Sequence, residues 1–151
     1  MGTVIPDVYK RQREGLKWSQ RLLAAGGNDE DRALAAITEL FCASNCGRIE
    51  LEMIARVSRC APLFAASARP WVGPLADAYA AAWSYASGDP VAAARAIPVC
   101  ERAVEAARQY APAVVALTMQ PLMWANVDAG FVGAARRCGE EALALATQNH
   151  R

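Results

Sequence analysis

The sequence predicts an all-α protein built as an α-solenoid, and two observations support this. Gly47, Gly88 and Gly130 lie 41 and 42 residues apart, each between two runs of helix-forming residues. A repeat of this length made from paired helices is typical of α-solenoids. In addition, 34 of the 151 residues are alanine, the strongest helix former, and no segment alternates apolar and polar residues over the length of a strand.

The first two of seven expected helices are bounded by glycines. The first covers residues 13–25 and ends at Gly26-Gly27, because glycine is favoured just after a helix. The second covers residues 30–46, begins after Asn28 or Asp29 as its N-cap, and ends at Gly47. Its apolar positions share one helical face, namely Ala33, Ala36, Ile37, Leu40, Phe41 and Ser44.

Prolines mark the limits of the third and fourth helices. The third covers residues 49–66 with Leu51 facing inward, and Pro62 is expected to kink it or end it early. The fourth covers residues 69–87 and starts at Pro70, since proline costs little in a first turn. The outward face of the third helix carries Glu50, Glu52, Arg56 and Arg59, and the inward stripe of the fourth is Leu75, Ala78, Tyr79, Ala82, Trp83 and Ala86.

The last three helices complete the expected array. The fifth begins at Pro90 and runs to residue 110, the sixth covers residues 112–128, and the seventh covers residues 131–147 with Phe131 facing inward. The second helix is expected to pair with the third, the fourth with the fifth and the sixth with the seventh. The first helix is then half of a pair, and residues 13–148 form a single helical-repeat domain.

The segment from Gly130 to Ala146, GFVGAARRCGEEALALA, resembles the second helix of the tetratricopeptide-like repeats of bacterial ATPase transcription regulators of the LuxR and maltose-activator type. The stretch from Gly88 to Ala107 is similar to a second copy, and Trp18–Gly27 to an earlier one. The resemblance implies a sensor or docking arm attached to a nucleotide-switching domain and an output domain. The period of 41 to 42 residues exceeds that of standard tetratricopeptide repeats and leaves the repeat class open.

A second resemblance concerns the N-terminus. Asp7–Gln12, DVYKRQ, resembles the translation of a transposon end used to prepare sequencing libraries. It implies that residues 1–12 are an artefactual or disordered leader, and that the chain is a metagenomic fragment with a truncated end at residues 149–151. The alternative is an ordinary polar leader.

We expect a non-catalytic scaffold that binds a protein partner or a small effector, as the interaction arm of a larger transcription regulator. Two alternatives stay open: the repeat tail of a multidomain enzyme such as a nucleotide cyclase, and a free-standing adaptor. Self-association through exposed solenoid ends is also expected, because open apolar stripes associate. The contact residues would be Leu122, Leu143 and Leu145.

The charge and the cysteine content limit which classes of partner and which cellular compartment are expected. The formal net charge is +1 without a block of like charge, so direct contact with nucleic acid is not expected. Five irregularly spaced cysteines and a start without a secretory signal indicate the cytoplasm. Residues 109–127 are uncharged over nearly a membrane-spanning length, but their prolines and polar residues favour a buried solenoid helix over a membrane contact.

No catalytic, cofactor or metal site is expected. His150 is the only histidine, which argues against histidine-dependent nucleophilic catalysis and histidine-based zinc sites. Cys42, Cys46 and Cys60 could supply thiolates for a metal site or a redox sensor. Zinc usually takes four ligands, however, and the alternative is that these cysteines act as small buried apolar residues.

Five large aromatic residues are the candidate binding residues: Trp71, Tyr79, Trp83, Tyr85 and Trp124. On the concave face of a solenoid they would anchor a partner, because aromatic residues dominate interface hot spots. The alternative is that they pack between helices, because they follow the apolar stripes.

Overall fold

The computed structural model describes residues 4–64, 69–84 and 88–148, and every regular element in them is helical. The prediction of an all-α protein is therefore confirmed, while the proposed truncated end at residues 149–151 lies outside the described residues. The helices are α1 (Val4–Ala25), α2 (Asp29–Asn45), α3 (Leu51–Cys60), α4 (Val72–Ser84), α5 (Pro90–Tyr110), α6 (Val115–Asp128) and α7 (Val132–Gln148), with 3-10 turns η1 (Ala61–Phe64) and η2 (Pro112–Val114).

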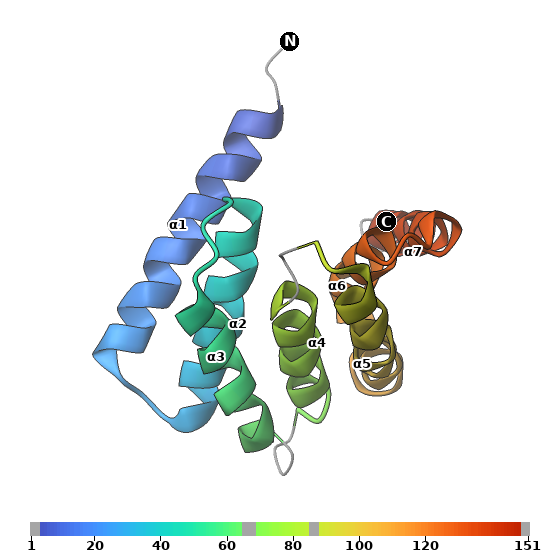
Figure 1. Ribbon diagram of the computed structural model, residues 1–151. Coiled ribbons are helices and arrows are strands. Elements are labelled where there is room, and N and C mark those ends of the chain that lie inside the picture. The colour runs from blue at the N-terminus through green and yellow to red at the C-terminus, as the bar shows by residue number, and fades with distance from the viewer. Residues whose placement is uncertain (1–3, 65–68, 85–87, 149–151) are drawn as a thin grey trace.

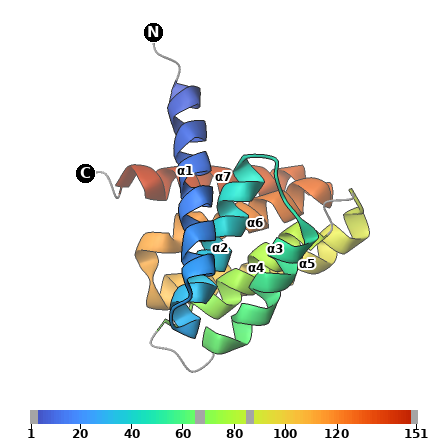
Figure 2. The same cartoon turned by 90° about the vertical axis from the view of Figure 1, so that its left-hand side faces the viewer.

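Each helix packs mainly against its neighbours in sequence (Figure 1). The array runs from α1 at the left of that view, through α4 in the middle, to α7 at the right. The helix direction changes along the array: in Figure 2, α1 stands upright in front and α7 lies nearly crosswise behind it. The chain therefore advances one helix at a time along a turning path.

The helices fall into two sets, which we call the even-numbered and the odd-numbered side. α4 contacts both α2 and α6, although each is two helices away along the chain. Within the described residues, the backbones of α1 and α3, of α3 and α5, and of α5 and α7 do not come this close. The even-numbered helices are therefore close together, whereas the odd-numbered helices are spread apart and leave room for grooves between them.

The core consists of two apolar clusters that meet at α4. The first joins α1, α2 and α3 to one face of α4, with Leu40 and Tyr79 fully buried. The second joins the other face of α4 to α5 and α6, and Leu145 of α7 packs against it. Alanine supplies more than half of the buried positions of the second cluster, so helix axes can approach closely there.

Gly47 and Gly130 follow the ends of α2 and α6, as the sequence predicted. Gly47, Gly88 and Gly130 have φ angles of 65°, 80° and 84°, a region that residues with a side chain rarely adopt. The starts of α2 and α5 are capped by side chains. The Asn28 side chain accepts a hydrogen bond from the Asp31 amide at 2.8 Å, and the Asp89 carboxylate accepts one from the Val91 amide at 2.9 Å.

Several predicted boundaries differ from the structure. α1 begins at Val4, so the helix extends back through residues 4–12, which the sequence analysis placed outside the domain. α3 ends at Cys60, because Pro62 lies in the η1 turn that follows. α6 begins at Val115, because Pro112 opens the η2 turn in front of it. Residues 65–66 and 85–87, predicted to be helical, lie outside the described residues.

Three side chains lie on the opposite side from the one predicted. Leu51 is 84% exposed and Phe131 53% exposed, although both were expected to face inward. Both stand at a helix start, where the Cα–Cβ bond tilts away from the body of the helix. Arg56, expected outward, is partly buried against Glu39.

No helix among the described residues is both long and apolar enough to cross a membrane.

Candidate functional site

Tyr79 belongs to the core and not to a surface. Its side chain is 1% exposed, and its ring meets that of Phe41 edge-on, with 6.1 Å between centroids. Its hydroxyl donates a hydrogen bond to Oε1 of Gln120 at 3.0 Å, so it links α2, α4 and α6. Burial, with smaller contributions from Cys100 and Cys42, raises the pKa of Tyr79.

Trp83 of α4 and Trp124 of α6 come together on the even-numbered side, and we call them the tryptophan pair. Their ring centroids are 6.4 Å apart and their planes are tilted by 45°. Trp124 is 40% exposed and Trp83 is half-buried. The indole nitrogen of Trp83 is buried and has no hydrogen-bond partner among the described residues.

The surface around the tryptophan pair is apolar along α6. Leu117 and Val127 are seven and three residues from Trp124, which places them on the same side of the helix, and both are exposed. The two remaining aromatic candidates do not join this surface in the described structure. Trp71 is half-buried against the first core cluster, and Tyr85 lies outside the described residues.

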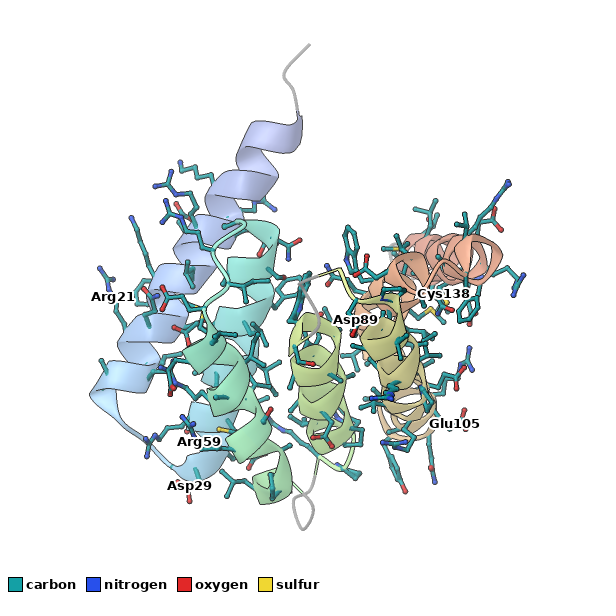
Figure 3. The ribbon with its side chains drawn as sticks, in the orientation of Figure 1. Arg21, Asp29, Arg59, Asp89, Glu105 and Cys138 are labelled. Atoms are coloured by element: carbon teal, nitrogen blue, oxygen red, sulfur yellow. The ribbon has the colours of Figure 1, made fainter. Side chains whose placement is uncertain are left out.

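A groove of about 510 Å³ opens between α1 and α3, with α2 as its floor, and we call it the arginine groove. Leu23 and Ala24 of α1 form an apolar wall, while three arginines stand against a single glutamate on the other walls. Figure 3 labels Arg59 on this side of the molecule. The polar and sulfur-bearing lining residues are Gln20, Arg32, Glu39, Arg56, Arg59 and Cys60.

The three arginines of this groove differ in their partners. Arg56 binds the Glu39 carboxylate, which is 4% exposed and lies deep in the groove. Arg59 donates a hydrogen bond to Oε1 of Glu52 at 2.6 Å, and both side chains are largely exposed. The guanidinium group of Arg32 takes part in none of the ion pairs between described residues.

Cys60 lies among these three guanidinium groups. Burial raises the pKa of the Cys60 thiol, whereas the charges of Arg59, Arg32 and Arg56 act to lower it. Burial also raises the pKa of Cys42, so neither thiol is poised as a thiolate at neutral pH. In the part of the chain that the structure describes, no group of three or more His, Cys, Asp or Glu residues could hold a metal ion.

A second groove, of about 620 Å³, opens between α5 and α7 over α6, and we call it the glutamate groove. Arg108 of α5 reaches across it and donates a hydrogen bond to Oε1 of Glu141 on α7 at 2.7 Å. Glu105 and Cys138 lie on this side of the molecule in Figure 3. Its charged lining residues are Glu101, Glu105, Glu141, Arg102 and Arg108, and its apolar floor carries Met119 and Leu122.

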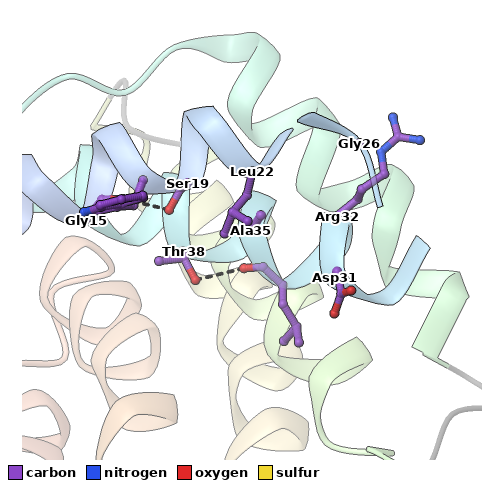
Figure 4. A pocket seen from close by; sticks show the side chains of 10 residues that line it. Gly15, Ser19, Leu22, Gly26, Asp31, Arg32, Ala35 and Thr38 are labelled. Carbon is purple, nitrogen blue, oxygen red and sulfur yellow. Dashed lines mark hydrogen bonds between the residues drawn. The ribbon is translucent and has the colours of Figure 1, made fainter. Parts of the chain in front are cut away.

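A smaller hollow of about 400 Å³ lies between α1 and α2 (Figure 4). Leu22 and Ala35 face each other in it, and Trp18 stands exposed at its edge beneath the guanidinium group of Arg21, 5.0 Å from the ring centroid. Ser19 donates its hydroxyl hydrogen to a backbone carbonyl of its own helix. This hollow is mainly apolar, and its charged lining residues are Asp31 and Arg32 of α2.

The sequence analysis missed the arginine groove. Arg32 and Glu39 were not singled out, and the outward face assigned to Arg56 and Arg59 hid their convergence on α2. The sequence did contain one indication of a buried charge. Glu39 lies three residues after Ala36 and one before Leu40, within the apolar stripe of its helix. A carboxylate inside such a stripe requires a basic partner from a neighbouring helix.

Comparison with known proteins adds no family to this description. No protein family matches the sequence. Neither the comparison with curated proteins nor that with solved structures gives a match.

Proposed function

We propose that the chain is an α-solenoid of antiparallel helix pairs that works as a binding scaffold without catalytic activity. The close approach of α2, α4 and α6, together with the separation of α1, α3, α5 and α7, supports this architecture. Helices that crowd on one side and spread on the other produce a curved superhelix with a concave inner face. The even-numbered side is that concave face.

The observation that carries the proposal is the tryptophan pair, Trp83 and Trp124, on the concave face. Half-exposed aromatic side chains contribute more to interfaces than other residues, because they bury large areas with little loss of conformational entropy. Leu117 and Val127 extend the surface along α6. A surface of this kind suits the apolar side of a helix or an extended segment from a partner protein.

The absence of catalysis is part of the same proposal. The two grooves contain two half-buried thiols, Cys60 and Cys138, and burial raises the pKa of each. A nucleophilic thiolate needs a lowered pKa. In the cell, we propose that this scaffold is the cytoplasmic interaction arm of a larger bacterial transcription regulator, a step that rests on the resemblance of residues 130–146 to the repeats of those proteins.

Site-specific photo-crosslinking in bacterial cells tests this proposal. A photoreactive amino acid in place of Trp124 is expected to give a discrete crosslinked partner, which excess unlabelled protein competes away and the Trp83→Ala substitution abolishes. The matched control is the same amino acid in place of Leu51, which is more exposed but lies on α3, outside the concave face. Equal crosslinking from both positions, or none from position 124, would count against a concave binding surface.

A further inference from the structure

The arginine groove and the glutamate groove repeat one geometry with opposite charge. Each opens between two odd-numbered helices over an even-numbered one, and each contains one half-buried cysteine, Cys60 or Cys138. The arginine groove sets three guanidinium groups against one carboxylate, whereas the glutamate groove sets three carboxylates against two guanidinium groups. The formal net charge of the whole chain is only +1, so the opposite charges of the two grooves come from where the charged residues lie and not from an overall excess.

The carboxylates near the arginine groove leave part of its positive charge uncompensated. Glu39 binds Arg56, and Glu52, which does not line the groove, binds Arg59. A guanidinium group has five N–H donors, so one carboxylate does not exhaust either arginine. Arg32 takes part in no ion pair between described residues, and Asp29 is the one further carboxylate that acts on the Cys60 thiol.

We propose that the arginine groove binds a small organic anion, a carboxylate or phosphate group joined to an apolar body. Arg32 and Arg59 bind the charged group, because the planar guanidinium matches an oxyanion with two parallel hydrogen bonds. Leu23 and Ala24 cover the apolar body from α1. The groove volume of about 510 Å³ falls in the range of small-molecule sites.

The arginine groove lies on the odd-numbered side and is separate from the tryptophan pair. The proposed anion site therefore does not depend on the proposed binding of a protein partner. A ligand in the groove would touch both α1 and α3, whose backbones do not approach each other closely in the described structure. Binding would therefore add a link between two helices that each pack against α2. A small effector at this position can stiffen one end of the array.

Protection of Cys60 from alkylation tests the proposal in the intact chain. Iodoacetamide, a neutral reagent, is applied with and without phenyl phosphate as the anionic probe, and the modified peptides are quantified by mass spectrometry. Saturable protection of Cys60 is expected at millimolar phenyl phosphate. Cys138, equally half-buried but set among glutamates, is the internal control and is expected to show none. Benzyl alcohol, which has the aromatic ring but no charge, tests whether the anionic group is needed. Benzoate tests whether a carboxylate protects Cys60 as well as a phosphate does.

Two variants connect the protection to the proposed ligands. Arg32→Gln breaks no ion pair in the described structure, and about tenfold weaker protection is expected from the loss of its charge-assisted hydrogen bonds. Arg59→Gln is expected to act in the same direction, whereas Arg136→Gln on the exposed face of α7 is expected to leave protection unchanged. Thermal melts verify that each variant is folded.

Three results would overturn the inference. They are no saturable protection by phenyl phosphate or benzoate, equal protection of Cys60 and Cys138, and equal protection in the folded Arg32→Gln variant and the unmodified chain. None of them bears on crosslinking from position 124, so this test and that of the proposed function fail separately.

Discussion

The buried ion pair between Glu39 and Arg56 is the residue-scale interaction on which the α2–α3 contact most depends. Glu39 is 4% exposed, and its partner comes from the next helix. Removing one member of such a pair leaves a charge without compensation in the protein interior. The Arg59–Glu52 pair is the natural comparison, because both of its side chains are more than half exposed.

We expect Arg56→Leu to lower the free energy of unfolding by about 2 kcal/mol, less than for a fully enclosed pair because the Arg56 side chain is 32% exposed. Arg59→Leu is expected to lower it by less than about 1 kcal/mol, as exposed pairs generally do. Urea denaturation followed by circular dichroism measures both values. Equal losses would show that burial of Glu39 does not decide the contribution of the pair.

Cys100 gives the fold a sensitivity to alkaline pH. Burial raises its pKa from 9.0 to about 12, and burial also raises the pKa of Tyr79. The unfolded chain therefore releases these protons at a lower pH than the folded chain. The stability that protonation provides is complete below pH 9.0 and is lost as the pH rises toward 12.

Unfolding free energies measured at rising pH are expected to fall above pH 9.0, with a slope of up to about 1.4 kcal/mol per pH unit for each group. The Cys100→Ala substitution removes one of these groups, so the unfolding free energy should fall less steeply with pH. A smaller pH dependence should remain, because Tyr79 still contributes to it. A slope that is identical in the two proteins would exclude Cys100 as a source of the pH dependence.

The α1–α2 contact depends on the glycine at position 15. A Cβ atom added there would lie 2.8 Å from Sγ of Cys42, closer than atoms of neighbouring helices can pack. The first helix was predicted to begin at residue 13, two residues before Gly15. In the structure Gly15 lies within α1 and allows α2 to approach.

Gly15→Ala is therefore expected to destabilise the chain by about 1 kcal/mol, because overpacking of roughly 1–3 kcal/mol outweighs the gain in helix propensity of about 1 kcal/mol. In a Cys42→Ala background the crowding sulfur is gone, and the same substitution should become stabilising. Thermal melts of the unmodified chain, the two single variants and the double variant test whether the effect of Gly15→Ala on stability changes sign. Additive effects in the double variant would contradict a direct contact between the two positions.

Local and long-range determinants explain which elements could be predicted from the sequence. The helix ends at Gly47 and Gly130 could be predicted because a positive φ angle depends on the residue itself. The exposure of Leu51 could not, because it depends on which neighbouring helix reaches the start of α3. The arginine groove was hidden for the same reason, since its lining comes from three helices.

At the scale of the whole molecule, the exposed surface of α7 indicates where copies of the chain would associate. Of the three residues expected to mediate self-association, Leu122 is buried and Leu145 packs against the second cluster, whereas Leu143 is 70% exposed. Val132, also on α7, is equally exposed. Apolar side chains open to solvent on one helix favour association.

Sedimentation velocity over a range of protein concentrations is expected to show reversible association that Leu143→Glu weakens. Leu51→Glu is the control, because Leu51 is at least as exposed but lies on α3, which does not contact α7 in the described structure. An unchanged association in Leu143→Glu, or an equal effect of both substitutions, would remove α7 as the contact surface.

Stability is expected to be local along the array, because each helix packs mainly on its neighbours and the two core clusters meet at α4. Amide hydrogen exchange of a Leu40→Ala variant tests it most directly. Leu40 is fully buried in the first cluster, and its truncation costs about 2–5 kcal/mol. The account predicts faster exchange in α1, α2 and α3 with α6 and α7 unchanged. A uniform acceleration in all seven described helices would contradict it.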